Sequence, residues 1–133
     1  MVKWIRVNRV KTLFGIGFFA LAISAFAVST NAGPYEDGVE ATKRGDHATA
    51  LQFWQPLADQ GHADAQFNLG VMYRDGRVLP QDFAAAHMWF TLAIAQGLEE
   101  AQTARDSLVK RMTHGQIEEA TLMAREWRAE HQQ

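Results

Sequence analysis

The sequence predicts an all-α fold, a short α-solenoid built from antiparallel pairs of helices. Two observations lead to this prediction. The chain repeats itself at an interval of 36 residues, between segments 46–66 and 82–102, and a period of roughly 20 to 50 residues is typical of solenoids, in which each unit buries its apolar face against its neighbour. Apolar residues inside one unit also recur three and four positions apart, which is the spacing of an amphipathic helix.

The two copies of the repeat agree at seven of 21 aligned positions. The identical pairs are Asp46/Asp82, Ala48/Ala84, Ala50/Ala86, Gln60/Gln96, Gly61/Gly97, Ala65/Ala101 and Gln66/Gln102. Two large rings also recur in swapped order, as Phe53-Trp54 and Trp89-Phe90. Because rings at helical spacing fill the space between packed helices, we interpret these aromatic residues as core and not as a cofactor site.

The first 32 residues predict a signal peptide. Four basic and no acidic residues occur among the first 12, and an apolar stretch follows at 13–28. That stretch is shorter than the ~20 residues of a membrane-spanning helix, so an uncleaved anchor is the alternative interpretation. Small residues suit cleavage after Ala27 or Ala32, and the polar residues before Ala32 favour the second site. The sequence therefore predicts a periplasmic or secreted protein.

Six helices are expected in the remaining domain, residues 33–133. Their expected ranges are 35–44, 46–60, 64–75, 82–96, 99–112 and 114–130. Gly45, Gly61 and Gly97 stand where a residue with positive φ would close a helix. Asp46 and Asp82 stand where a carboxylate would accept hydrogen bonds from the first free amides of the next helix.

Three of these helices carry further signals. Pro56 falls inside helix 46–60, where its missing N–H predicts a kink or a shorter helix. Helix 82–96 is apolar on two sides, so it is expected to lie between neighbouring helices. Thr113 and Gln116 predict a capping box that opens the last helix, whose apolar stripe is completed by Trp127.

One stretch of the repeat carries a family resemblance. Its motif reads Leu69-Gly70-x-x-Tyr73-x-x-Gly76, Pro80-Gln81-Asp82 and Ala86-x-x-Trp89-x-x-x-Ala93-x-x-Gln96-Gly97. This pattern resembles the Sel1-like repeat, a relative of the tetratricopeptide repeat, and the resemblance implies a right-handed superhelix. It divides the domain into a shortened repeat at 35–61, a full repeat at 63–98 and a C-terminal cap at 99–130.

The shortened repeat and the cap depart from the family pattern. In the first repeat, Gly38 would take the place of Gly70 after the loss of four loop residues. Val78 replaces the second loop glycine of the family. Arg105 and Asp106 stand where a third repeat would show its Leu-Gly pair, which is why we interpret 99–130 as a cap.

The resemblance implies a non-enzymatic scaffold or adaptor that binds another protein or peptide, often in the bacterial envelope. Two alternatives remain open: a membrane-tethered adaptor with the N-terminal anchor retained, and a small envelope hydrolase similar to disulfide-rich members of the family that are linked to β-lactam hydrolysis. The chain has no cysteine, and Ser107, the one serine of the predicted mature domain, lacks a Gly-x-Ser-x-Gly turn. Catalytic residues and cofactors are therefore not expected.

Composition and histidine spacing argue against two further kinds of ligand. Removal of residues 1–32 leaves nine basic and 15 acidic residues, a formal charge of −6, and an acidic domain repels nucleic acid. The five histidines show no pair at the i, i+4 spacing of a helical zinc site. His62 and Asp64 are interpreted as the start of a helix and not as a metal site.

The resemblance to tetratricopeptide repeats also implies where a partner would bind. The first helix of each unit would line the concave face, and the residues there that packing does not require are Lys43, Asn68, Val71 and Arg74. With about two repeats, the face would hold a short peptide or one helix. The alternative is that Asn68 and Arg74 are ordinary exposed residues, with Arg74 favoured by the negative end of its helix dipole. The sequence does not determine the oligomeric state.

Overall fold

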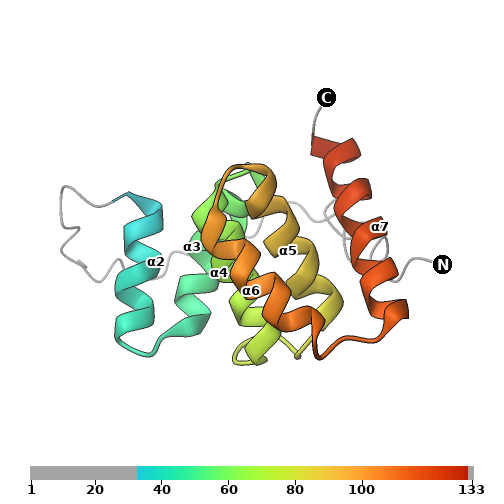
Figure 1. The fold of residues 1–133 in the computed structure, drawn as a ribbon. Coiled ribbons are helices and arrows are strands. Elements are labelled where there is room, and N and C mark those ends of the chain that lie inside the picture. Colours follow the sequence, from blue (N-terminus) through green and yellow to red (C-terminus); the bar gives the residue numbers. More distant parts are fainter. Residues whose placement is uncertain (1–32, 132–133) are drawn as a thin grey trace, which may run out of the picture.

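The computed structural model describes residues 33–131, so the predicted signal peptide at 1–32 lies outside the described residues. Within this range the chain forms six α-helices and no strand (Figure 1). They are α2 (Pro34–Lys43), α3 (His47–Asp59), α4 (Ala63–Asp75), α5 (Phe83–Ala95), α6 (Glu99–Val109) and α7 (His114–His131). The prediction of an all-α solenoid of paired helices is confirmed. No helix in the described part of the chain is long and apolar enough to cross a membrane.

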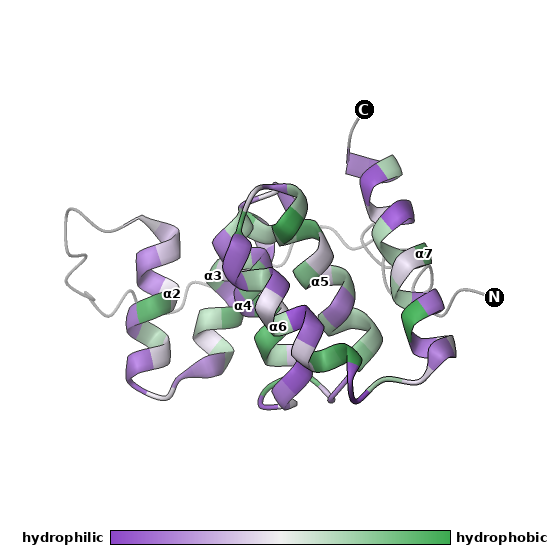
Figure 2. Cartoon of the chain, viewed as in Figure 1, coloured by the Kyte–Doolittle hydropathy of each residue, from purple (hydrophilic) through white to green (hydrophobic). Residues whose placement is uncertain are grey.

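Successive helices pack side by side in chain order, α2 on α3, α3 on α4, α4 on α5 and α5 on α6 (Figure 1). Helix α7 packs against α5 as well. Helix α5 therefore contacts three other helices, and every residue from Ala84 to Phe90 is buried. This confirms the predicted position of helix 82–96 between neighbours. Figure 2 shows the contrast between the apolar α5 and the more polar α2 and α7.

Two glycines let the first and second helix of a pair approach closely. A Cβ atom added to Gly38 would lie 2.3 Å from Nε1 of Trp54, and one added to Gly70 would lie 2.5 Å from Cε1 of Phe90. Trp54 and Phe90 are themselves 36 residues apart in the sequence. The structure thus places Gly38 and Gly70 in the same packing role, in which only a hydrogen leaves room for the ring.

The caps predicted at five helix ends are confirmed. Gly45, Gly61 and Gly97 have φ values of 77°, 88° and 93°, the left-handed region that closes a helix when glycine occupies it. The carboxylate of Asp46 accepts a hydrogen bond from the backbone N–H of Thr49, and that of Asp82 from the N–H of Ala85. These caps fix the sharp turns that make consecutive helices antiparallel.

The capping box of the last helix is also present, whereas the expected end of α6 needs correction. Thr113 N–H donates to Gln116 Oε1 at 2.9 Å, and Gln116 N–H donates to Thr113 Oγ1 at 3.3 Å. Helix α6 ends at Val109 instead of residue 112, because Arg111 and Met112 form tighter bonds to carbonyl oxygens three residues back. Helix α3 is not shortened at Pro56 and continues to Asp59.

The second helices of the two repeats share one register. Helices α3 and α5 end at Asp59 and Ala95, an interval of 36 residues. Helix α6 carries Asp106 at the position of Gly70, so the close approach to the following helix seen at the two glycines is lost. Helix α7 packs instead against α5, where Trp127 meets Trp89 edge-on with ring centroids 6.1 Å apart.

The buried residues form two clusters. The larger one runs from Ala41 through Trp54, Leu69 and Trp89 to Trp127, so it joins α2, α3, α4, α5 and α7. The smaller one, centred on Phe90, joins α4, α5 and α6. Both clusters lie between helices that neighbour one another in space, as expected for a solenoid.

Candidate functional site

The four residues predicted to bind a partner lie on two first helices. Asn68, Val71 and Arg74 lie on α4 at intervals of three residues, so they share one side of that helix. Lys43 lies in the last turn of α2. Its Nζ donates to Glu40 Oε1 at 2.6 Å, and this hydrogen bond lowers the pKa of Glu40. Arg44, four residues after Glu40, is also within helical reach of this carboxylate, but Lys43 contacts it instead.

Asn68 connects the first helices of the two repeats. Its Nδ2 donates to the hydroxyl oxygen of Tyr35 at 3.2 Å, across 33 residues of sequence. The backbone carbonyl of Tyr35 accepts a hydrogen bond from Trp54 Nε1 at 3.2 Å. The Tyr35 ring also stacks on His62, with centroids 5.1 Å apart. Tyr35 therefore links α2, α3 and the start of α4, and Asn68 has a structural role in addition to its predicted one.

Val71 and Arg74 also have partners within the chain. Val71 is half-buried and packs against the smaller apolar cluster. Arg74 donates from Nε to Asp75 Oδ1 at 2.7 Å, and this contact lowers the pKa of the Asp75 carboxyl. The Arg74 side chain is 32% exposed. Ion pairs with this much exposure contribute ~0–1 kcal/mol, so a partner's carboxylate can replace Asp75 at little cost.

The first helix of each pair begins with an acidic first turn. Glu36 of α2, Asp64 of α4 and Glu100 of α6 all lie in first turns. Burial raises the pKa of Tyr35, its hydrogen bond from Asn68 opposes the rise, and the charges of these three carboxylates add to it. We call Tyr35, Glu36, Asp64 and Glu100 the acidic edge. The acidic first turns are visible in the sequence, but their influence on Tyr35 is not.

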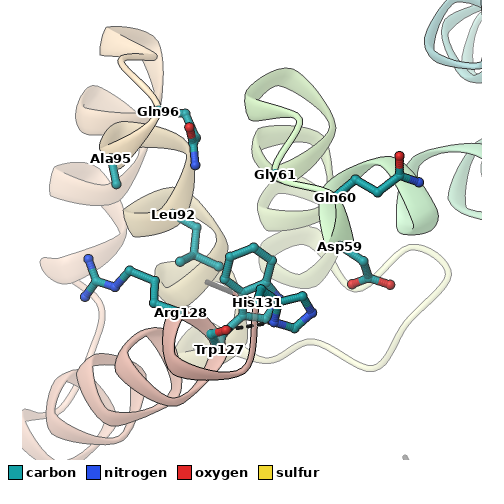
Figure 3. A pocket seen from close by; sticks show the side chains of 9 residues that line it. All are labelled: Asp59, Gln60, Gly61, Leu92, Ala95, Gln96, Trp127, Arg128 and His131. Carbon is teal, nitrogen blue, oxygen red and sulfur yellow. Dashed lines mark hydrogen bonds between the residues drawn. The ribbon is translucent and has the colours of Figure 1, made fainter. Parts of the chain in front are cut away.

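A cleft of about 470 Å³ lies at the C-terminal ends of α3, α5 and α7 (Figure 3). Each helix end contributes three of its nine lining residues. They are Asp59, Gln60 and Gly61 from α3 and its turn, Leu92, Ala95 and Gln96 from α5, and Trp127, Arg128 and His131 from α7. Sequence reasoning missed this cleft, although Gln60-Gly61 and Gln96-Gly97 belong to the repeat that it recognised.

The α7 wall of the cleft is built on a stacked pair of rings. Trp127 and His131 lie with centroids 4.1 Å apart and planes within 8° of parallel. His131 Nδ1 lies 2.7 Å from the carbonyl oxygen of Trp127. Since a carbonyl only accepts, Nδ1 carries the proton and donates, which leaves Nε2 as the free nitrogen of the ring. The structure thus sets the tautomer of His131.

The comparison with protein families agrees with the repeat found in the sequence. A family model described as the Sel1 repeat matches residues 26–62 and 63–98, which is more than half of the chain. The chain belongs to the Sel1 repeat family. Sel1 repeats generally mediate interactions between proteins, and the family is typically non-enzymatic.

Two curated proteins resemble part of this Sel1 chain. Each is named "DAP3-binding cell death enhancer 1", one from Rattus norvegicus and one from Mus musculus. Each is 39% identical over 49 residues, which cover 37% of this chain and 10% of the relative. The chain therefore spans about a tenth of the length of these relatives.

The remaining titratable residues of the Sel1 domain have local roles. His62 opens α4, where its Nδ1 accepts from the N–H of Ala65 at 3.3 Å. Burial, then the charge of Arg105, lowers the pKa of His87. Ser107 is exposed on α6. Between residues 33 and 131, no three His, Cys, Asp or Glu side chains gather where they could hold a metal ion.

Proposed function

We propose that this protein is a non-enzymatic interaction module of the cell envelope that binds a partner protein or peptide on the face formed by α2 and α4. Membership of the Sel1 family supports a protein-binding role. The observation that carries the choice of face is the Asn68–Tyr35 hydrogen bond. It holds the first helices of the two repeats together, so that one surface spans both repeats.

The charges on this face favour a partner with a basic group. The acidic edge has carboxylates in the first turns of α2, α4 and α6, and the opposite ends of α2 and α4 carry Lys43 and Arg74. A peptide with a basic residue at one end and an acidic residue at the other would match both ends. Such complementarity orients a partner and raises its association rate more than its affinity.

Site-specific photo-crosslinking tests the face. A benzoylphenylalanine at Val71 is expected to crosslink a partner in cells that produce the full chain, because Val71 lies between the acidic edge and Arg74 on α4. The matched control is the same group at Leu122, which is 53% exposed on α7. A partner crosslinked from both positions, or from neither under several growth conditions, would contradict binding on the α2/α4 face.

A second pair of variants tests the charge match. Glu36→Gln and Arg74→Gln are both expected to weaken crosslinking from position 71. Arg125→Gln on α7 and Asp106→Asn on α6 serve as controls of the same charge change on exposed residues elsewhere. Equal crosslinking in all four variants would leave the face without its proposed electrostatic basis.

The envelope location is proposed from the N-terminal residues alone. Export with cleavage after Ala32 predicts that the protein recovered from an envelope fraction begins at Gly33. Mass spectrometry of its N-terminal peptide measures this directly. Recovery of the uncleaved chain in the membrane fraction would instead support the tethered adaptor, and recovery in the cytoplasm would contradict export.

A further inference from the structure

The cleft at the ends of α3, α5 and α7 lies on second helices and the last helix, so it is separate from the proposed binding face on α2 and α4. Its walls carry opposite charges. Asp59 lies on the α3 side, whereas Arg128 lies on the α7 side (Figure 3). The Asp59 carboxylate accepts a hydrogen bond from Gln55 Nε2 at 3.1 Å. Among residues 33–131, Arg128 has no carboxylate within 4.0 Å and Asp59 has no basic group within 4.0 Å. The two charges thus line the cleft without an ionic partner in this part of the chain.

The rest of the lining suits a peptide. Leu92, Ala95 and the Trp127 indole provide apolar surface between the charged walls. Gln60 and Gln96 provide side-chain amides, each with a donor and an acceptor that match the N–H and C=O of a peptide bond. The Gln96 amide nitrogen lies 3.8 Å from the position that a Cβ at Gly61 would occupy, so it bridges the two helix ends. The volume of about 470 Å³ lies within the usual range of ligand sites, ~300–1,000 Å³.

We propose that this cleft binds the end of a peptide whose carboxylate contacts Arg128 and whose basic side chain contacts Asp59. A guanidinium is the side chain best suited to a carboxylate, because its parallel N–H groups match the two oxygens. A ligand with a carboxylate but no basic group would contact Arg128 and would leave Asp59 without a partner of opposite charge. Both ligand charges are therefore needed.

The probes follow from this chemistry. The first probe is acetyl-Lys-Ala with a free carboxylate, which carries both charges. The second is acetyl-Lys-Ala with a C-terminal amide, which lacks the negative charge, and the third is acetyl-norleucine-Ala, which lacks the positive charge. Titration of each into the uniformly ¹⁵N-labelled full chain is followed at the indole N–H of Trp127, which lines the cleft. The chain has four tryptophans, so a Trp127→Phe spectrum identifies the resonance.

Acetyl-Lys-Ala is expected to shift the Trp127 resonance and to bind up to about fivefold more tightly than either singly charged analogue, since one exposed charged contact contributes up to about a factor of five. Arg128→Gln should remove the advantage of the free carboxylate, and Asp59→Asn the advantage of lysine. Arg125→Gln, an exposed arginine on the same helix outside the cleft, should change neither.

A steric variant separates binding in the cleft from charge effects elsewhere. Ala95→Trp fills the cleft without altering a charge, and it should abolish the shift while the thermal unfolding midpoint stays close to that of the wild type. The proposal is overturned if the three probes bind equally, if Arg128→Gln and Asp59→Asn bind acetyl-Lys-Ala as the wild type does, or if no probe shifts Trp127 at millimolar concentration. None of these results bears on crosslinking from Val71, so the two proposals fail independently.

Discussion

Replacement of Gly70 by alanine is expected to destabilise the domain through one collision. The new Cβ would lie 2.5 Å from Cε1 and 2.6 Å from Cδ1 of Phe90, whereas carbon atoms in contact normally lie ~3.5–4.0 Å apart. The ring or the helix must therefore move by about 1 Å. Overpacking of this kind costs roughly 1–3 kcal/mol, and the higher helix propensity of alanine returns about 1 kcal/mol. The expected net loss is about 1 kcal/mol, within a range of about 0–2 kcal/mol, and 1 kcal/mol corresponds to roughly 4–8 °C in the thermal midpoint of a domain of this size.

Urea and thermal unfolding followed by circular dichroism measure this loss, and a double-mutant cycle identifies its cause. Phe90→Leu removes the ring, so Gly70→Ala in that background should be neutral or stabilising, with a coupling energy of at least about 1 kcal/mol. Gly115→Ala is the control, because a Cβ there meets no atom within 4 Å. The reasoning is refuted if Gly70→Ala is as stable as the wild type, or if Phe90→Leu fails to relieve its effect.

Three further predictions concern caps and protonation. Asp82→Ala removes the carboxylate that accepts from the Ala85 N–H at 2.9 Å and should cost about 1 kcal/mol in urea unfolding; no change would mean that the cap is dispensable. Hydrogen bonds from Thr49 lower the pKa of Asp46, so its contribution is present above the ordinary carboxyl pKa of about 4 and is lost as pH falls through the folded value. The urea midpoints of wild type and Asp46→Ala should thus converge in acid, and a gap that stays constant with pH would contradict this. Burial lowers the pKa of His87, so the unfolded chain binds more protons below about pH 6.5 and stability falls as pH drops below that value. His87→Gln should flatten this slope in unfolding midpoints measured between pH 7 and pH 5, and an unchanged slope would assign it to other groups.

Local chemistry explains why so much of the helical framework could be predicted from the sequence. Asp46, Asp82 and the Thr113–Gln116 pair act on amides only two or three residues away, and Gly45, Gly61 and Gly97 adopt positive φ at helix ends. These interactions depend on neighbours in the chain, so a sequence pattern is sufficient to identify them. The 36-residue period is likewise a property of the sequence itself, and it leads to the Sel1 family.

Spacing along the chain does not decide between several possible ionic partners. Glu40 contacts Lys43 at 2.6 Å and not Arg44, although i, i+3 and i, i+4 neighbours are both within reach on a helix. Asp106 lies 3.7 Å from Arg105, although Lys110 is the i, i+4 neighbour. The roles proposed for Lys43, Asn68, Val71 and Arg74 stay predictions, to which the structure adds an intrachain contact for each.

The sequence by itself determined the helical class, the paired helices, the caps and the family, because periodicity and capping act over short distances along the chain. Only the tertiary structure decided that α7 packs on α5, that Tyr35 meets Asn68 across 33 residues, and that three helix ends enclose a cleft. The physical reason is that these contacts join segments from different layers of the solenoid. Their geometry depends on how closely the helices approach, which is set by the shapes of buried residues such as Gly70 and Phe90.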